Sequence, residues 1–203
     1  MPNHVADNTT GDVLAQHYYL YKQDFARLHE FGAPHYSPSI SWPRIFPFGH
    51  GPVNAEGLAH YDDVIDTLIA NGIKPALSLF HWDTPLALFN EFGGWSSPKI
   101  VEHYVNYAKF IITRYDDKVP IWFTINEPQY CNWQYGWYPA GDYYPSYGVE
   151  KGIEARFLCG HHTLLAHAKV AKWYHEEFKG KGKITFKNSG SKSPYIVWSI
   201  ALC

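Results

Sequence analysis

The chain has 203 residues, of which 46% are hydrophobic, and its 17 Lys and Arg against 19 Asp and Glu give a net charge of -2. One folded domain usually takes ~100–200 residues, so this length and composition predict a single ordered domain and exclude a low-complexity chain. No basic block could neutralise a run of phosphates, so nucleic acid is excluded as an expected partner.

Helices and strands are predicted to alternate along the chain. Apolar residues recur at spacings of three and four over 17–31, 55–70, 99–115 and 153–178, a pattern typical of amphipathic helices. Apolar, β-prone runs lie between and after them at 33–42, 73–82, 119–125 and 183–186, and each is predicted to be a strand. Pro38 is unfavourable inside the first of these strands.

This alternation predicts a parallel sheet covered by helices, for which a doubly wound sheet and a barrel are both suitable architectures. Polar clusters, His-Trp-Asp at 81–83 and Asn-Glu-Pro at 126–128, directly follow two successive strands, where barrel enzymes place their active sites. No Gly-rich phosphate loop follows any strand, which disfavours a nucleotide-binding sheet. We therefore predict an α/β fold: a partial (β/α)8 TIM barrel of about four to five βα units, forming one incomplete domain over residues 1–203.

The cysteines and the N-terminus give little indication of export. Cys131, Cys159 and Cys203 are odd in number and lack Cys-x-x-Cys spacing, so free buried thiols are expected rather than a disulfide framework or a zinc site. Residues 1–14 lack the basic and apolar segments of a signal peptide, and no apolar run reaches the ~20 residues that span a bilayer. No membrane association is expected, and a cytoplasmic location is the default expectation.

Glu127 is the first candidate for chemistry. It follows an apolar strand and the amide of Asn126, where partial desolvation can keep a carboxyl group protonated near neutral pH, as a general acid requires. Asn-Glu-Pro is also an ordinary strand-to-loop turn, in which the glutamate would be solvated. The tripeptide alone leaves both interpretations open.

His81 and Trp82 offer a hydrogen-bonding imidazole and a flat apolar face, which together suit the mixed surface of a pyranose ring. A core histidine beside a packing tryptophan is the alternative. Aromatic residues crowd the segment after Glu127, either as a sugar-stacking loop or as a packed loop. They are Trp133, Tyr135, Trp137, Tyr138, Tyr143 and Tyr144.

Three histidines of the last predicted helix, His161, His162 and His167, lack the His-Glu-x-x-His arrangement. They are interpreted as core or helix-surface residues, and no metal is inferred.

Four runs, in this order, resemble family 1 glycoside hydrolases: Ser-Ile-Ser-Trp-Pro-Arg at 39–44, His-Trp-Asp-Thr-Pro at 81–85, Phe-Gly-Gly-Trp at 92–95 and Thr-Ile-Asn-Glu-Pro at 124–128. The resemblance covers roughly residues 6–184. The runs Tyr-Leu-Tyr-Lys-Gln-Asp at 19–24 and Ile-Phe-Pro-Phe-Gly at 45–49 make the chain most similar to fungal β-glucosidases. The resemblance implies a (β/α)8 barrel that hydrolyses β-glucosides with retention of configuration and without a cofactor. The implied partner is a small-molecule β-glucoside or oligosaccharide.

The resemblance also implies roles for the candidate residues. Glu127 matches the acid/base, which protonates the leaving oxygen and later activates water, while a second carboxylate ~5–5.5 Å away attacks the anomeric carbon. Asn126 would hold the sugar 2-hydroxyl, and His81 and Trp82 the 3-hydroxyl side of the same ring. The Thr-Glu-Asn-Gly run that carries the nucleophile is absent from the sequence, and so is the family's first strand, expected before Asp7.

The sequence departs from the family in further places. Ser37 stands where most members carry an arginine that supports the nucleophile, Pro38 stands where they carry phenylalanine, and residues 190–203 no longer resemble the family. Other carboxylates near predicted loops are disfavoured as substitute nucleophiles; they are Asp83, Glu91 and Asp142. The expected function is that of the acid/base-bearing part of a β-glucosidase with at most trace activity alone. A sugar-binding protein without catalysis and a product without a function of its own are the alternatives.

Overall fold

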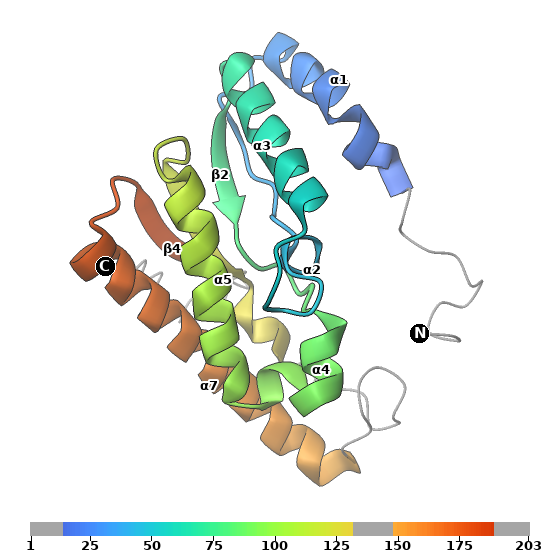
Figure 1. The fold of residues 1–203 in the computed structure, drawn as a ribbon, viewed down its shortest axis with the longest axis vertical. Coiled ribbons are helices and arrows are strands. Elements are labelled where there is room, and N and C mark those ends of the chain that lie inside the picture. The colour runs from blue at the N-terminus through green and yellow to red at the C-terminus, as the bar shows by residue number, and fades with distance from the viewer. Residues whose placement is uncertain (1–13, 132–147, 189–203) are drawn as a thin grey trace, which may run out of the picture.

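The computed structural model of the chain describes residues 14–131 and 148–188, and Figure 1 shows their arrangement. In these two segments a long helix precedes each strand. The order is α1 (His17–Glu30), β1 (His35–Tyr36), α3 (Ala55–Ala70), β2 (Lys74–Ser78), α5 (Lys99–Tyr115), β3 (Ile121–Asn126), α7 (Gly148–Trp173) and β4 (Lys183–Lys187). Shorter elements are η1 (Leu14–Gln16), α2 (Trp42–Ile45), α4 (Leu86–Phe92), η2 (Gly94–Ser96), η3 (Pro128–Tyr130) and the π-helical turn η4 (Tyr174–Phe178).

The long helices follow the predicted periodicity. The bounds of α3 and α5 are those predicted, and α1 ends one residue before its predicted end. The last helix, α7, begins at Gly148 rather than Ile153, and its final predicted turn is the π-helical η4. Within the two described segments, no helix has the length and apolar character needed to cross a membrane.

The strands form one parallel sheet in the order β1-β2-β3-β4. Ala76 of β2 lies opposite Ile121 of β3, which in turn lies opposite Lys183 of β4. Neighbouring helices lie side by side in chain order, α1 with α3 and α5 with α7 (Figure 1). Sequential parallel strands joined through helices are the repeating units of a (β/α)8 barrel. The described chain is therefore an open part of such a barrel, which confirms the predicted fold class.

Aromatic side chains of α5 fill the space between helices and sheet. Tyr104 and Tyr107 are buried because the buried positions of α5 recur at spacings of three and four. Trp42 of α2 stacks on Tyr107, with ring centroids 5.2 Å apart. The Tyr107 hydroxyl donates to the Leu79 carbonyl oxygen at 2.9 Å, and the Tyr104 hydroxyl donates to the Thr124 carbonyl oxygen. These bonds fix the carboxyl ends of β2 and β3, where the predicted site residues lie.

β1 is the shortest strand, so the predicted strand over 33–42 is wrong in extent. The chain nevertheless stays beside β2 after β1 ends. The Ser78 N–H donates to the Pro38 carbonyl oxygen and the Ile40 N–H donates to the Ser78 carbonyl oxygen, both at 2.9 Å. The regular ladder is interrupted at Pro38 because proline has no N–H to donate.

The Ser37 hydroxyl replaces the hydrogen bond that Pro38 cannot make. In a parallel ladder a residue turns its N–H and C=O to the same neighbouring strand, and the Pro38 carbonyl faces β2. An N–H at this position would reach the Ala76 carbonyl oxygen, and the Ser37 hydroxyl donates to that oxygen at 2.7 Å. The two neighbouring residues that depart from the family pattern therefore compensate one another.

Cys131 and Cys159 form a disulfide, so the expectation of free thiols is wrong for these two residues. Cys131 directly follows η3 and Cys159 lies within α7, with their Cα atoms 5.6 Å apart. The sequence could not indicate this pair because 28 residues separate them and only the packing of α7 against η3 brings them together. Cys203 lies outside the described residues.

Candidate active site

The structure brings the four predicted site residues to one edge of the sheet. His81 and Trp82 follow β2, Asn126 is the last residue of β3, and Glu127 comes next. The Asn126 N–H donates to the Phe80 carbonyl oxygen at 2.9 Å, so the two clusters lie across from each other. Asn126 is 6% exposed, whereas His81 is exposed. This is the edge at which barrel enzymes assemble their active sites.

Two of these four residues have a left-handed backbone, which is uncommon outside glycine. Trp82 has φ 67° and Glu127 has φ 52° and ψ 66°. Glu127 also precedes Pro128, and the residue before proline is normally driven to extended conformations. Such conformations cost on the order of 1–3 kcal/mol each and cluster at active sites, where the surrounding structure holds them. The backbone therefore favours the active-site interpretation of Asn-Glu-Pro over that of an ordinary turn.

Bonds on both sides hold Glu127 in this conformation. Its N–H donates to the Lys187 carbonyl oxygen of β4 at 2.8 Å. Its carbonyl oxygen accepts from the Tyr130 N–H at 2.9 Å, which closes the η3 turn. One residue further on, Cys131 is joined covalently to α7.

The cost of the left-handed backbone can be measured at Glu127 itself. We expect Glu127→Gly to be more stable than Glu127→Ala by about 0.5–1 kcal/mol, because glycine relieves the left-handed strain while losing more backbone entropy. Midpoints of urea unfolding compare the two variants. At Thr113, exposed in the helical backbone of α5, the order should reverse, with glycine less stable than alanine by about 1 kcal/mol. The same order at both positions would contradict a strained Glu127.

Trp82 presents an unused hydrogen-bond donor. Its indole Nε1 is buried and has no hydrogen-bond partner among the described residues. The ring lies against Phe80 and Tyr130, with centroids 5.5 Å and 6.1 Å away. A buried donor without a partner costs about 1–3 kcal/mol, which a ligand oxygen at this position would recover.

Asp83 anchors the turn that carries His81 and Trp82. Burial raises the pKa of the Asp83 carboxyl group, and hydrogen bonds from the Ser41 hydroxyl and from the backbone N–H groups of the turn and of Trp42 act in the opposite direction. Asp83 thus ties the turn to the start of α2. Of the other carboxylates considered, Glu91 is exposed on α4 and Asp142 lies outside the described residues.

Lys187 is a charged residue of this edge that sequence reasoning missed. Its ammonium group donates to the Ser37 hydroxyl oxygen at 2.7 Å and lies 4.4 Å from the centroid of the Phe123 ring. Burial lowers the pKa of Lys187, and the nearby charge of Glu127 opposes that shift. Among the described residues, no carboxylate forms an ion pair with it. The available signal was a lysine directly after the predicted strand 183–186, in the next predicted strand after the one that Asn126 and Glu127 follow.

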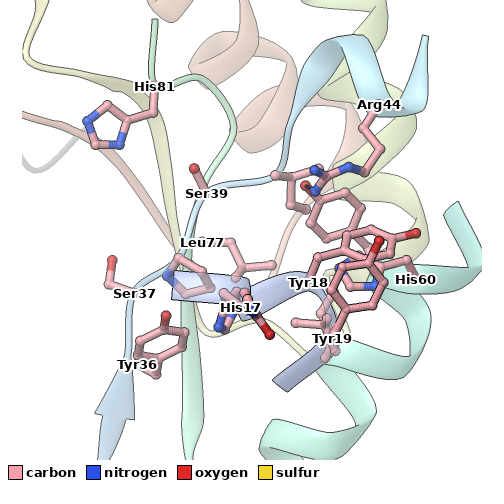
Figure 2. Close-up of a pocket in the computed structure, with 16 residues that line it drawn as sticks. His17, Tyr18, Tyr19, Tyr36, Ser37, Ser39, Arg44, His60, Leu77 and His81 are labelled. Atoms are coloured by element: carbon pink, nitrogen blue, oxygen red, sulfur yellow. Dashed lines mark hydrogen bonds between the residues drawn. The ribbon is translucent and has the colours of Figure 1, made fainter. Parts of the chain in front are cut away.

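A cavity of about 450 Å³ extends along β1, away from most of the predicted site. Figure 2 shows His81 at the upper left and Tyr18 and His60 at the right, with Ser39 between them and Ser37 above Tyr36 at the left. Of the four predicted site residues only His81 lines it. The other three predicted site residues, Trp82, Asn126 and Glu127, do not line this cavity.

The remaining candidates of the sequence lie on α7, where they are buried, half-buried or exposed, or outside the described residues. His162 Nδ1 is 2.9 Å from the Trp95 carbonyl oxygen, and His167 Nδ1 is 2.7 Å from the Thr124 hydroxyl oxygen. His161 is exposed on α7. No cluster of metal-binding side chains is found in the described segments. The six aromatic residues predicted to form a loop after Glu127 lie outside these segments.

The motifs and the fold agree with one family. Residues 1–195 match the family model of glycosyl hydrolase family 1, and the chain belongs to this family. It is 41% identical over 192 residues to avenacosidase 1 of Avena sativa, covering 88% of this chain and 33% of that protein. It is 40% identical to β-glucosidase 26 of Oryza sativa subsp. japonica, covering 90% of this chain and 37% of that protein. The chain thus spans about a third of the length of these relatives.

Solved structures of β-glucosidases also superpose on this chain. A rice β-glucosidase superposes with a TM-score of 0.81 at 32% identity, covering 92% of this chain and 41% of the rice chain. The β-glucosidase of Thermotoga maritima in complex with deoxynojirimycin superposes with a TM-score of 0.81 at 36% identity, with the same coverage. These relatives come from plants and a bacterium, so the likeness to fungal β-glucosidases stays a prediction.

Proposed function

We propose that the chain is the acid/base-bearing part of a retaining β-glucosidase and that Glu127 is the acid/base. The observation that carries this proposal is the left-handed backbone of Glu127 at the carboxyl end of β3, directly after the buried Asn126. A catalytic role explains why a glutamate at this edge of a family 1 barrel keeps a strained backbone, whereas a solvated turn residue would adopt a relaxed backbone conformation.

In this proposal the described edge holds the sugar and supplies the proton. The Glu127 carboxylic acid protonates the leaving glycosidic oxygen while a carboxylate from outside this chain attacks the anomeric carbon, and Glu127 then takes a proton from the water that releases the glucose. Asn126, His81 and Trp82 bind the sugar hydroxyls, and the buried Trp82 Nε1 gains an acceptor. A Glu-to-Gln variant of the rice enzyme forms a covalent complex with glucose. Because this chain is similar to the rice enzyme, that complex supports a retaining mechanism here.

The first test is to sequence the transcript through the codons that follow Ser189. We expect a reading frame that continues to a Thr-Glu-Asn-Gly run, and we expect the longer protein to hydrolyse 4-nitrophenyl β-glucoside. In that protein Glu127→Gln should lower kcat by about 10²–10⁴-fold and remove the alkaline limb of the pH profile, because that limb reports the loss of the proton from the general acid. Full activity of the Gln variant would exclude Glu127 as the acid/base.

Sugar binding without hydrolysis is the second candidate function, favoured by the exposed His81 and by the Trp82 indole, whose N–H has no partner in residues 14–131 and 148–188. Calorimetry of the 203-residue chain with deoxynojirimycin tests it. Saturable heat that Trp82→Phe removes would support a binding protein. No heat is expected if the site needs a second wall, because an open edge must pay the full cost of ordering the ligand.

A further inference from the structure

The disulfide between Cys131 and Cys159 lies within four residues of Glu127, and neither the family motifs nor the proposed chemistry gives it a role. Both sulfur-bearing residues are buried, at 3% and 0% exposure. The bridge connects two different parts of the fold, the end of the η3 turn and the middle of α7. It is the covalent anchor of the segment that leaves the candidate active site.

Glu127 needs a restraint on its C-terminal side as well as on its N-terminal side. A left-handed residue before a proline persists only when its neighbours over-determine its conformation. On the N-terminal side β3 and the bond from the Glu127 N–H to Lys187 supply that restraint. On the C-terminal side the restraints are the bond from the Tyr130 N–H to the Glu127 carbonyl oxygen and, beyond it, the disulfide.

We propose that the Cys131–Cys159 disulfide is a positioning device for Glu127, and that its reduction by a dithiol releases Glu127 from the active-site conformation. This inference rests on the proposed role of Glu127 for its functional meaning. The bridge holds η3 on α7, and η3 holds the left-handed residue that precedes it. Without the bridge the strain at Glu127 is relieved by rotation of the η3 turn away from β4.

A route for the reductant is present. A cavity of about 420 Å³ opens between η3 and α7, and Cys131 is part of its wall. Its other lining residues include Pro128 and Gln129 of η3 and Arg156, Phe157 and Gly160 of α7. From this cavity a small thiol can approach Cys131, the more exposed of the two cysteines.

The reaction is a two-electron thiol–disulfide exchange. A thiolate of the dithiol attacks the Cys131 sulfur, the bond between the two cysteine sulfurs breaks, and Cys159 leaves as a thiolate that takes up a proton. The second thiol of the reagent then attacks the mixed disulfide, which frees Cys131 as a thiol. The dithiol is oxidised to its cyclic disulfide, and both cysteines are reduced.

Thiol counting comes first. The chain has three cysteines, so the denatured, unreduced protein should show one thiol that reacts with Ellman's reagent, and the reduced protein should show three. Three reactive thiols in protein purified under oxidising conditions would overturn the proposal.

Hydrogen exchange of backbone amides, followed by NMR before and after dithiothreitol, tests the positioning itself. We expect the amides of Glu127 and Tyr130 to exchange about tenfold faster or more after reduction. The Leu79 amide, which donates to Phe123 at 2.8 Å in the same sheet, is the internal control and should keep its protection. Equal exchange at Glu127 in both redox states, or an equal loss at Leu79, would overturn the proposal.

Matched variants distinguish the effect of losing the disulfide from any other effect of dithiothreitol. Cys131→Ser with Cys159→Ser should show the fast exchange without dithiothreitol and no response to it, whereas Cys203→Ser should respond like the parent chain. If the double variant does not fold, the comparison of oxidised and reduced parent chain still decides. The readout involves no hydrolysis, so a failure of the proposed enzymatic function leaves this result unaffected, and the reverse also holds.

Discussion

The 203-residue chain should hydrolyse 4-nitrophenyl β-glucoside at least about 10⁴-fold more slowly than a full-length relative such as the rice β-glucosidase. The acid/base and the nucleophile of a retaining glycosidase act on one transition state, so loss of either removes most of the rate. Glu127 lies at the carboxyl edge of the described sheet. The other carboxylate there, Asp83, accepts hydrogen bonds from Ser41 and from the backbone, so it is not placed to act as a nucleophile. Steady-state rates at equal protein concentration provide the comparison.

The same reasoning gives a sharper expectation for Glu127→Gln in the 203-residue chain. If the trace rate does not pass through the two-carboxylate mechanism, the substitution should change it by less than about twofold, because the effects of groups that act together are not additive. The matched surface control is Lys183→Gln, because Lys183 is exposed at the start of β4, at the end of the sheet opposite Glu127. A parent rate within about tenfold of the full-length enzyme, abolished by Glu127→Gln, would show that this chain completes the site by another route.

Much of the fold follows from local patterns. The helix periods over 55–70 and 99–115 give the bounds of α3 and α5 because their apolar faces pack on the sheet along their whole length. The short elements α2, α4 and η2 escaped prediction because single turns such as Trp42–Ile45 are set by tertiary contacts, here the stacking of Trp42 on Tyr107. A window of four to seven residues contains too few apolar positions to define a period.

The candidate site was predictable only where chemistry and sequence position coincide. Glu127 and Asn126 could be named because they directly follow an apolar strand, but their placement opposite Phe80 depends on the sheet register. Lys187 reaches Ser37 from the far strand of the sheet, a contact across 150 positions that no local pattern encodes. The Cys131–Cys159 pair escaped prediction for the same reason.

Asp116→Ala should destabilise the chain by about 2–4 kcal/mol, because the carboxylate satisfies buried donors at the end of the sheet opposite the candidate site. One oxygen, Oδ1, accepts from Trp122 Nε1 at 3.0 Å and from the Tyr174 hydroxyl at 2.7 Å. The other, Oδ2, accepts from the Lys181 N–H at 3.1 Å. Trp122 and Tyr174 are both 0% exposed, so neither donor can turn to water when the carboxylate is removed.

The position of Asp116 makes this loss larger than that of a surface charge. It caps the C-terminus of α5, and its partners belong to β3, to η4 and to the turn that enters β4. Burial, followed by the Asp116 carboxylate, raises the pKa of Tyr174, which keeps the phenol protonated as a donor across the accessible pH range. One carboxylate thus joins the last helix and the last strand to the rest of the sheet.

Urea unfolding followed by circular dichroism, with Asp117→Ala as the control, measures the effect. Asp117 is exposed and adjacent in sequence, so its loss should change stability by less than about 0.5 kcal/mol. Asp116→Asn keeps one acceptor oxygen for the two side-chain donors but turns an N–H₂ group toward the Lys181 N–H, so a loss of about 1–2 kcal/mol is expected. Equal midpoints for Asp116→Ala and Asp117→Ala would mean that Trp122 and Tyr174 find other acceptors, and that the β4 end of the sheet is held by apolar packing alone.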